Sequence, residues 1–134
     1  MKNIFKRLFA VLVASALLLG CSSGGKEDKI LIGVSFASEV HYRNKFDSDI
    51  MTAKAEELGA EIVFQYANYD GTKQANQIDN LLSQGIDVLV LNAVSANMVN
   101  LVERVKAEGI PVITYDQTIE GTEIDLNVDR DNKK

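Results

Sequence analysis

Short apolar runs alternate with longer segments of helical periodicity from residue 29 onward. A short run rich in branched side chains is typical of a buried strand. Such runs predict strands at residues 30–36, 61–67, 88–91 and 112–116, with a weaker one at 124–128. Apolar residues three and four positions apart predict helices over 43–58, between Thr72 and Gly85, and between Ser95 and Gly109. Thr72 and Ser95 are the expected N-caps of the second and third helix.

A glycine separates each predicted helix from the strand that follows it. Gly59, Gly85 and Gly109 occupy these positions, at spacings of 26 and 24 residues. Glycine allows the left-handed conformation with which many helices end. Repeated units of this length predict a doubly wound α/β domain with a parallel sheet in the order 2-1-3-4-5. Ligands of such domains bind beyond the carboxyl ends of the strands, so functional residues are expected just after each strand.

Polar residues with planar groups follow the predicted strands. Residues 37–44 come after the first strand and residues 68–71 after the second. Asn92 follows the third strand, and Asp116 and Gln117 follow the fourth. Amide, guanidinium and carboxylate groups suit neutral polyols, because every buried hydroxyl needs hydrogen-bond partners. The pattern therefore favours a small ligand that is rich in hydroxyl groups.

Motifs of the common enzyme classes are absent from the sequence. No predicted strand is followed by a glycine-rich phosphate loop, and no G-x-S-x-G nucleophile elbow occurs. His41 is the only histidine and Cys21 the only cysteine, so neither a zinc site nor a disulfide within the chain is expected. The formal charge of −5 argues against nucleic acid, which requires a basic face. The sequence thus predicts a protein that is not an enzyme and has no cofactor.

The first residues have the composition of an export signal. Three basic residues up to Arg7 precede an apolar run over residues 8–19, which is too short to span a membrane as a helix. The run ends at Gly20-Cys21, which resembles a bacterial lipobox. The prediction is a lipoprotein signal peptide over 1–20, a lipidated Cys21 and a flexible tether over 21–28, with the protein on the outer face of the cell membrane, at the cell surface or in the periplasm. The alternatives are an ordinary signal peptide with an incidental cysteine, or a short membrane anchor.

Three stretches of the chain resemble one family of transport proteins. The stretches are residues 29–35, the sequence Q-A-N-Q-I-D-N-L-L-S-Q-G-I-D-V-L-V over 74–90, and G-I-P-V-I-T-Y-D over 109–116. They resemble the sugar-binding components of bacterial ABC importers of the ribose, xylose and galactose type, the xylose-binding members most of all. The resemblance implies the N-terminal lobe of a class I periplasmic binding protein over 29–134. It also implies a monosaccharide such as xylose held between two lobes, and an ABC importer permease as partner.

The resemblance assigns roles to individual residues. Arg43 matches an arginine that reaches the sugar from the first helix, and Asp116 matches a carboxylate that takes two sugar hydroxyls. Asn92 matches an asparagine that contacts sugar in ribose-type relatives. Gln117 stands where the family usually has arginine, and this departure removes a charged guanidinium group that could donate two parallel hydrogen bonds. Asn44 stands where some members stack an aromatic ring on the sugar.

The resemblance also implies a second lobe of similar size. Residues 131–134 resemble the start of the helix that leads into it. The expectation is therefore a chain truncated to one lobe, with the second lobe absent or supplied in trans by a separate chain. A different reading is a surface interaction or sensor module that does not transport. An enzyme on a flavodoxin-like fold fits the motifs less well, and in a repressor of the related fold the signal segment would occupy the place of the DNA-binding helices.

Overall fold

The computed structural model describes residues 29–39 and 42–129, with residues 42 and 43 described by their backbone alone. The predicted signal peptide, Cys21, the tether over 21–28 and residues 131–134 lie outside the described residues. The strands are β1 (Leu31–Phe36), β2 (Glu61–Tyr66), β3 (Val88–Leu91), β4 (Val112–Tyr115) and β5 (Leu126–Val128). The helices are α2 (Tyr42–Glu57), α3 (Gly71–Ser83) and α4 (Val99–Ala107).

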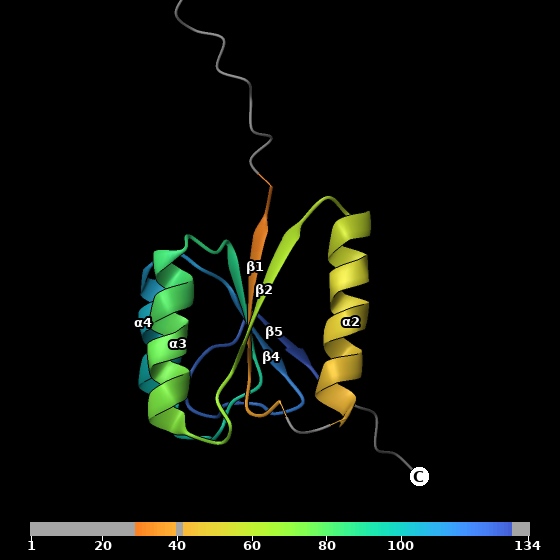
Figure 1. Cartoon of the computed structure of the whole chain (residues 1–134). Helices are drawn as coiled ribbons and strands as arrows, with labels where there is room; N and C mark the ends of the chain where they lie inside the picture. Colours follow the sequence, from red (N-terminus) through yellow and green to blue (C-terminus); the bar gives the residue numbers. More distant parts are fainter. Residues whose placement is uncertain (1–28, 40–41, 130–134) are drawn as a thin grey trace, which may run out of the picture.

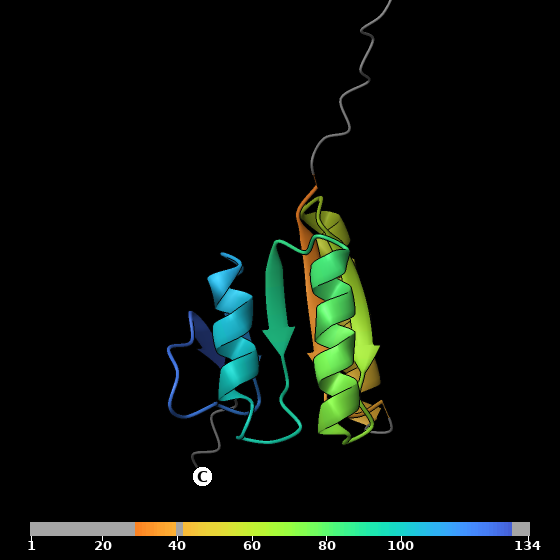
Figure 2. The same ribbon diagram turned by 90° about the vertical axis from the view of Figure 1, so that its left-hand side faces the viewer.

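The five strands form one parallel sheet in the order β2-β1-β3-β4-β5. Helix α2 lies on one face of the sheet, and α3 and α4 lie on the other, as Figure 1 shows. Figure 2 shows α3 and α4 side by side over their face. The prediction of a doubly wound sheet in the order 2-1-3-4-5 is confirmed. All carboxyl ends of the strands consequently meet at one edge, which is called the carboxyl edge below.

The main apolar core lies between the sheet and the pair α3 and α4. Its fully buried members come from α3, β3, α4 and β4: Ile78, Leu81, Leu89, Leu91, Val102, Val105 and Val112. Gly33 of β1 faces this core, and a Cβ there would come within 2.8 Å of Ile86 Cδ1. A glycine at this position therefore lets the segment before β3 pack directly against β1.

The opposite face of the sheet is covered less evenly. Leu31 and Val63 point toward α3 and α4. Because strand side chains alternate, Phe36 and Tyr66 point toward α2, where their ring centroids lie 5.9 Å apart. Strand β5 lies at the far edge from α2, and its Leu126 remains 53% exposed. On this face the described chain has a single covering helix.

Helix ends show where the predicted boundaries were right and wrong. Gly59, Gly85 and Gly109, which lie between each helix and the next strand, have positive φ angles of 75° to 82°. These angles confirm the expected left-handed helix ends. The prediction of Thr72 as an N-cap is wrong, because the Asp70 side chain accepts the Lys73 N–H at 2.9 Å and Thr72 falls inside the first turn. The prediction of Ser95 as a cap is also wrong. Helix α4 starts only after Met98, whose side chain is buried and caps nothing.

Candidate binding site at the carboxyl edge

The carboxyl edge holds the strained backbone of the described chain. Three residues other than glycine have positive φ there: Asn68 at 55°, Tyr69 at 62° and Asp116 at 64°. Asn68 and Tyr69 lie two and three residues after the end of β2, and Asp116 directly follows β4. Left-handed backbone is unfavourable for residues with a Cβ, and such residues cluster where a protein binds or reacts. The strain therefore marks this edge as the candidate site.

Asn92 ties the ends of three strands together. It follows β3, and its N–H donates to the Ser35 carbonyl of β1 at 2.9 Å. Its side-chain Oδ1 accepts the Ala37 N–H at 3.2 Å, just beyond β1. Its Nδ2 donates to the Tyr115 carbonyl at the end of β4 at 2.9 Å. The half-buried Asn92 amide thus lies next to the peptide that joins Tyr115 to Asp116.

Asp116 and Gln117 leave β4 through a sharp turn. The Asp116 N–H donates to the Val128 carbonyl of β5 at 2.9 Å, and the left-handed backbone of Asp116 then redirects the chain. Asp116 is half-buried, whereas Gln117 is exposed in the following bend. The fold therefore brings Asn92 and Asp116 together, and it places Gln117 on the open side of the same turn.

The start of α2 reaches the same edge, because it follows the loop that leaves β1. Arg43 lies in the first turn of α2, and its side chain lies outside the described part of the chain. Asn44 is 95% buried and donates from Nδ2 to the Ser38 carbonyl. Asn44 therefore ties the first turn of α2 to the residues just after β1.

Gln74 is a residue of this edge that sequence reasoning missed. Its side chain is fully buried at the start of α3. Its Nε2 donates to Ser35 Oγ and to the Asn92 carbonyl, both at 3.0 Å, and its Oε1 accepts the Val94 N–H at 2.8 Å. Gln74 is therefore the polar residue that holds the loop after β3. Its position on the apolar stripe of α3, four residues before Ile78, is the sequence signal that marks it.

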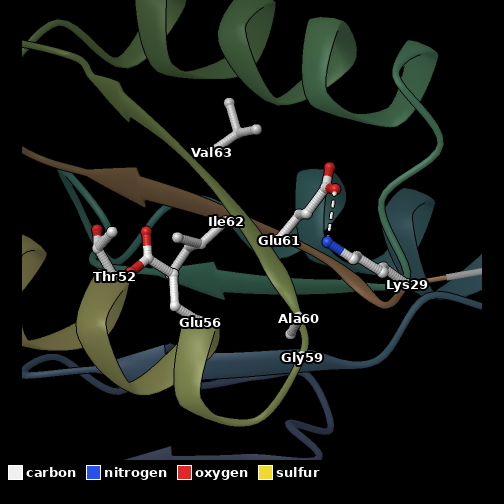
Figure 3. Close-up of a pocket in the computed structure, with 8 residues that line it drawn as sticks. All are labelled: Lys29, Thr52, Glu56, Gly59, Ala60, Glu61, Ile62 and Val63. Atoms are coloured by element: carbon white, nitrogen blue, oxygen red, sulfur yellow. Dashed lines mark ion pairs between the residues drawn. The ribbon is translucent and has the colours of Figure 1, made fainter.

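Two surface hollows lined by described residues flank the sheet. One of about 400 Å³ lies at the carboxyl edge, beside the start of α4, and is lined by Ala96, Asn97, Val99, Asn100 and Glu120. The other, about 490 Å³ in volume, lies at the amino ends of the strands, where Glu61 begins β2 (Figure 3). Its exposed Lys29 and Glu61 form an ion pair at 3.6 Å. The larger hollow therefore lies at the opposite end of the sheet from Asn92 and Asp116.

Clustered metal ligands and long apolar helices are two features that the described ranges lack. Within residues 29–39 and 42–129, no group of three His, Cys, Asp or Glu side chains is placed to hold a metal ion. In the same ranges, no helix combines the length and the apolar character needed to cross a bilayer.

Comparison with known proteins places this architecture in a family. The Periplasmic binding protein domain family matches residues 32–134. The D-xylose-binding periplasmic protein of Escherichia coli K12 is 36% identical over 130 residues, which span 96% of this chain and 39% of that protein. The ribose import binding protein of Bacillus subtilis is 27% identical over 84% of this chain and 37% of its own length.

Solved structures agree with the sequence relatives. An ABC transporter solute-binding protein from Clostridium phytofermentans with bound β-D-glucose superposes with a TM-score of 0.71 and 29% identity, over 76% of this chain and 32% of that one. The chain thus spans well under half the length of the relatives that it matches. The sequence, the sheet order and these matches agree that the chain belongs to the periplasmic binding protein domain family.

Proposed function

We propose that this chain supplies one wall of a monosaccharide site in an exported solute receptor of an ABC importer. The single observation that carries the proposal is the meeting of Asn92 and Asp116 at the carboxyl edge, joined through the Tyr115 carbonyl. Relatives named for D-xylose and ribose binding, and a structural neighbour with bound glucose, support a sugar of five or six carbons. A pentose such as xylose is the proposed ligand.

Each proposed contact residue has a distinct chemical role. The Asp116 carboxylate accepts hydrogen bonds from two neighbouring sugar hydroxyls, a geometry that one charged group provides well. Arg43 reaches the ligand from the first turn of α2. Asn92 offers the sugar the hydrogen-bonding capacity of its side-chain amide that the Ala37 N–H and the Tyr115 carbonyl do not use. Gln117 supplies an amide at the position of a family arginine, so it offers the sugar both donors and an acceptor in place of a charged guanidinium group.

One lobe covers only part of such a ligand. Two-lobed receptors bind by closing around a hinge, and the second wall removes the remaining water from the sugar. The proposed activity therefore needs a second lobe, either in the same polypeptide or from a separate chain. The receptor then delivers its sugar to the importer permease.

Attachment to the membrane is proposed through Cys21. Its place after a short apolar run fits lipidation, and residues 22–28 are small and polar enough to act as a tether. Labelling of cells with an alkyne fatty acid tests this. The expected result is labelled protein for the natural sequence and none for Cys21→Ser, and equal labelling of both would contradict the proposal.

The decisive experiment restores a second wall. A two-lobed chimera joins this chain to the remaining lobe of the Escherichia coli D-xylose-binding protein, and calorimetry measures binding of D-xylose, D-ribose and D-glucose. The chimera is expected to bind at least one sugar with micromolar affinity, and the 134-residue chain alone is expected to bind far more weakly. Micromolar binding by the chain alone would contradict the proposal.

The contact residues are tested in the same chimera. Asp116→Ala removes a charged acceptor of two hydroxyls and is expected to weaken binding about 100-fold. Asp79→Ala is the matched control, since Asp79 is an exposed carboxylate of α3 that pairs with Arg104 far from the edge. Normal sugar affinity in Asp116→Ala would show that the site is assigned to the wrong residues.

A further inference from the structure

Tyr115, the last residue of β4, connects the two sides of the candidate site. Its side chain points toward α2, where its hydroxyl donates to Asp47 Oδ2 at 2.7 Å. Its ring packs against Phe36, with centroids 5.9 Å apart and planes at 59°. The fully buried Phe36 gives the tyrosine ring a fixed wall. The ring and the hydroxyl therefore hold Tyr115 at two separate points.

The backbone of Tyr115 is held as firmly as its side chain. The Tyr115 carbonyl accepts Asn92 Nδ2 at 2.9 Å, and Tyr115 pairs with Val128 of β5 in the sheet. Asp116 follows in the left-handed conformation, with φ at 64°. The Asp116 N–H donates to the Val128 carbonyl at 2.9 Å, so the peptide that joins Tyr115 to Asp116 is held at both its carbonyl and its N–H. The orientation of the Tyr115 peptide therefore sets the position of the Asp116 carboxylate.

Asp47 links this strand end to the start of α2. It lies four residues after Arg43, so the backbone positions of the two residues are about one helical turn apart. Among the described helices α2 alone lies on this face of the sheet. Its end near the carboxyl edge adjoins residues 40–41, which the structure does not describe. The hydrogen bond to Tyr115 is thus a direct tie between the first half of α2 and the end of β4.

We propose that Tyr115 and Asp47 are positioning residues that set the distance between Arg43 and Asp116. This positioning role rests on the proposed function, since it matters for binding only if Arg43 and Asp116 contact the sugar. Tyr115 itself makes no sugar contact in this proposal. It acts through α2 on one side and through the Asp116 peptide on the other. Arg43 and Asp116 are therefore already in position when the sugar binds.

The geometric part is tested on the 134-residue chain by NMR of backbone amides. Tyr115→Phe keeps the ring and its packing but loses the hydroxyl. Its amide shifts are expected to change both in residues 42–47 and at Asp116 and Gln117. Thr52→Val is the matched control, because it removes a hydroxyl on α2 that donates to the Ser48 carbonyl at 2.8 Å. The control should leave the amide shifts of Asp116 and Gln117 unchanged.

Asp47 variants provide the rescue. Asp47→Asn keeps an oxygen acceptor for the Tyr115 hydroxyl and should retain most of the natural shifts, whereas Asp47→Leu should reproduce those of Tyr115→Phe. Adding Tyr115→Phe to Asp47→Leu should change little more, since both remove one interaction. Shift changes in Tyr115→Phe that stay near the ring and never reach the first turn of α2 would overturn the proposal.

The functional part is measured as sugar affinity in the two-lobed chimera. Tyr115→Phe is expected to weaken binding about fivefold, the effect of one lost hydrogen bond of ordinary strength. Asp47→Asn should bind within about twofold of the parent, and urea unfolding of each variant separates affinity from stability. Unchanged affinity in Tyr115→Phe overturns the positioning role. If the parent chimera binds no sugar at all, the proposed function fails while the NMR comparison still decides the tie.

Discussion

Replacing the buried Gln74 by methionine tests how the carboxyl edge is built. Methionine has nearly the same length and volume but offers neither a strong donor nor a strong acceptor. The change leaves the Val94 N–H and the Asn92 carbonyl without their partner, and it removes the bond to Ser35 Oγ. Each polar group left unsatisfied in a protein interior costs about 1–3 kcal/mol.

The net effect follows from the burial of these groups. Val94 and Asn92 are half-buried, so water replaces part of the lost bonding, and the methionine gains some apolar burial. The free energy of unfolding is therefore expected to fall by about 2–3 kcal/mol. For a domain of this size that corresponds to a fall in Tm of about 10–20 °C. Since domains are typically stable by about 5–15 kcal/mol, the variant should still fold at room temperature.

Gln77 on the same helix gives the control. Its Nε2 donates to the Tyr66 carbonyl at 3.1 Å, while its buried Oε1 has no hydrogen-bond partner in the described structure. Gln77→Met loses one bond and also removes an unsatisfied acceptor, so its stability should stay within about 1 kcal/mol of the parent. Urea unfolding followed by far-ultraviolet circular dichroism measures both variants. Equal losses in Gln74→Met and Gln77→Met would refute the claim that Gln74 organises the edge.

Two further predictions concern the sheet away from the site. Gly33→Ala places a Cβ about as close as 2.8 Å to Ile86 and should destabilise the chain by about 1–3 kcal/mol, with partial recovery on adding Ile86→Val, as thermal unfolding would show. The hydrogen bond from the Val112 N–H lowers the pKa of Asp125 below its usual value of 3.8, and the nearby Lys106 ammonium lowers it by a smaller amount. Stability from this carboxylate is therefore present above that value and lost as the pH falls through the lowered pKa. The urea midpoint should fall less between about pH 5 and pH 2 in Asp125→Asn than in the parent; a parallel fall would contradict this assignment.

The architecture could be predicted because its signals are local. Short apolar runs, helical stripes and a glycine after each helix all lie within a few residues of what they specify, and the sheet order follows from handedness. The strand ends that carry Asn92 and Asp116 were placed at one edge by the same reasoning. The last strand is shorter than predicted, because Asp125 uses its side chain to accept the Val112 N–H ahead of β5.

The contacts that shape the edge escaped prediction because their partners are distant in sequence. Gln74 bonds to Ser35, which lies 39 positions away, and Tyr115 bonds to Asp47 across 68 positions. Periodicity assigns a residue to a face but says nothing about which polar group it will meet there. Only the register of the strands and the packing of the helices determine these pairs. The direct contacts of Arg43, Asn92, Asp116 and Gln117 with a sugar remain predictions.

The two faces of the sheet contribute differently to binding and stability. The α3 and α4 face buries many apolar side chains completely, each stabilising the fold by about 1.5–3 kcal/mol. That core readily outweighs the left-handed backbone at Asn68, Tyr69 and Asp116, which costs about 1–2 kcal/mol per residue. The α2 face has one covering helix, so a single hydrogen bond such as Tyr115 to Asp47 has a larger share in fixing its geometry. Substitutions in the α3 and α4 core should therefore change stability before they change the site, whereas substitutions between α2 and β4 should alter the site while the sheet stays folded.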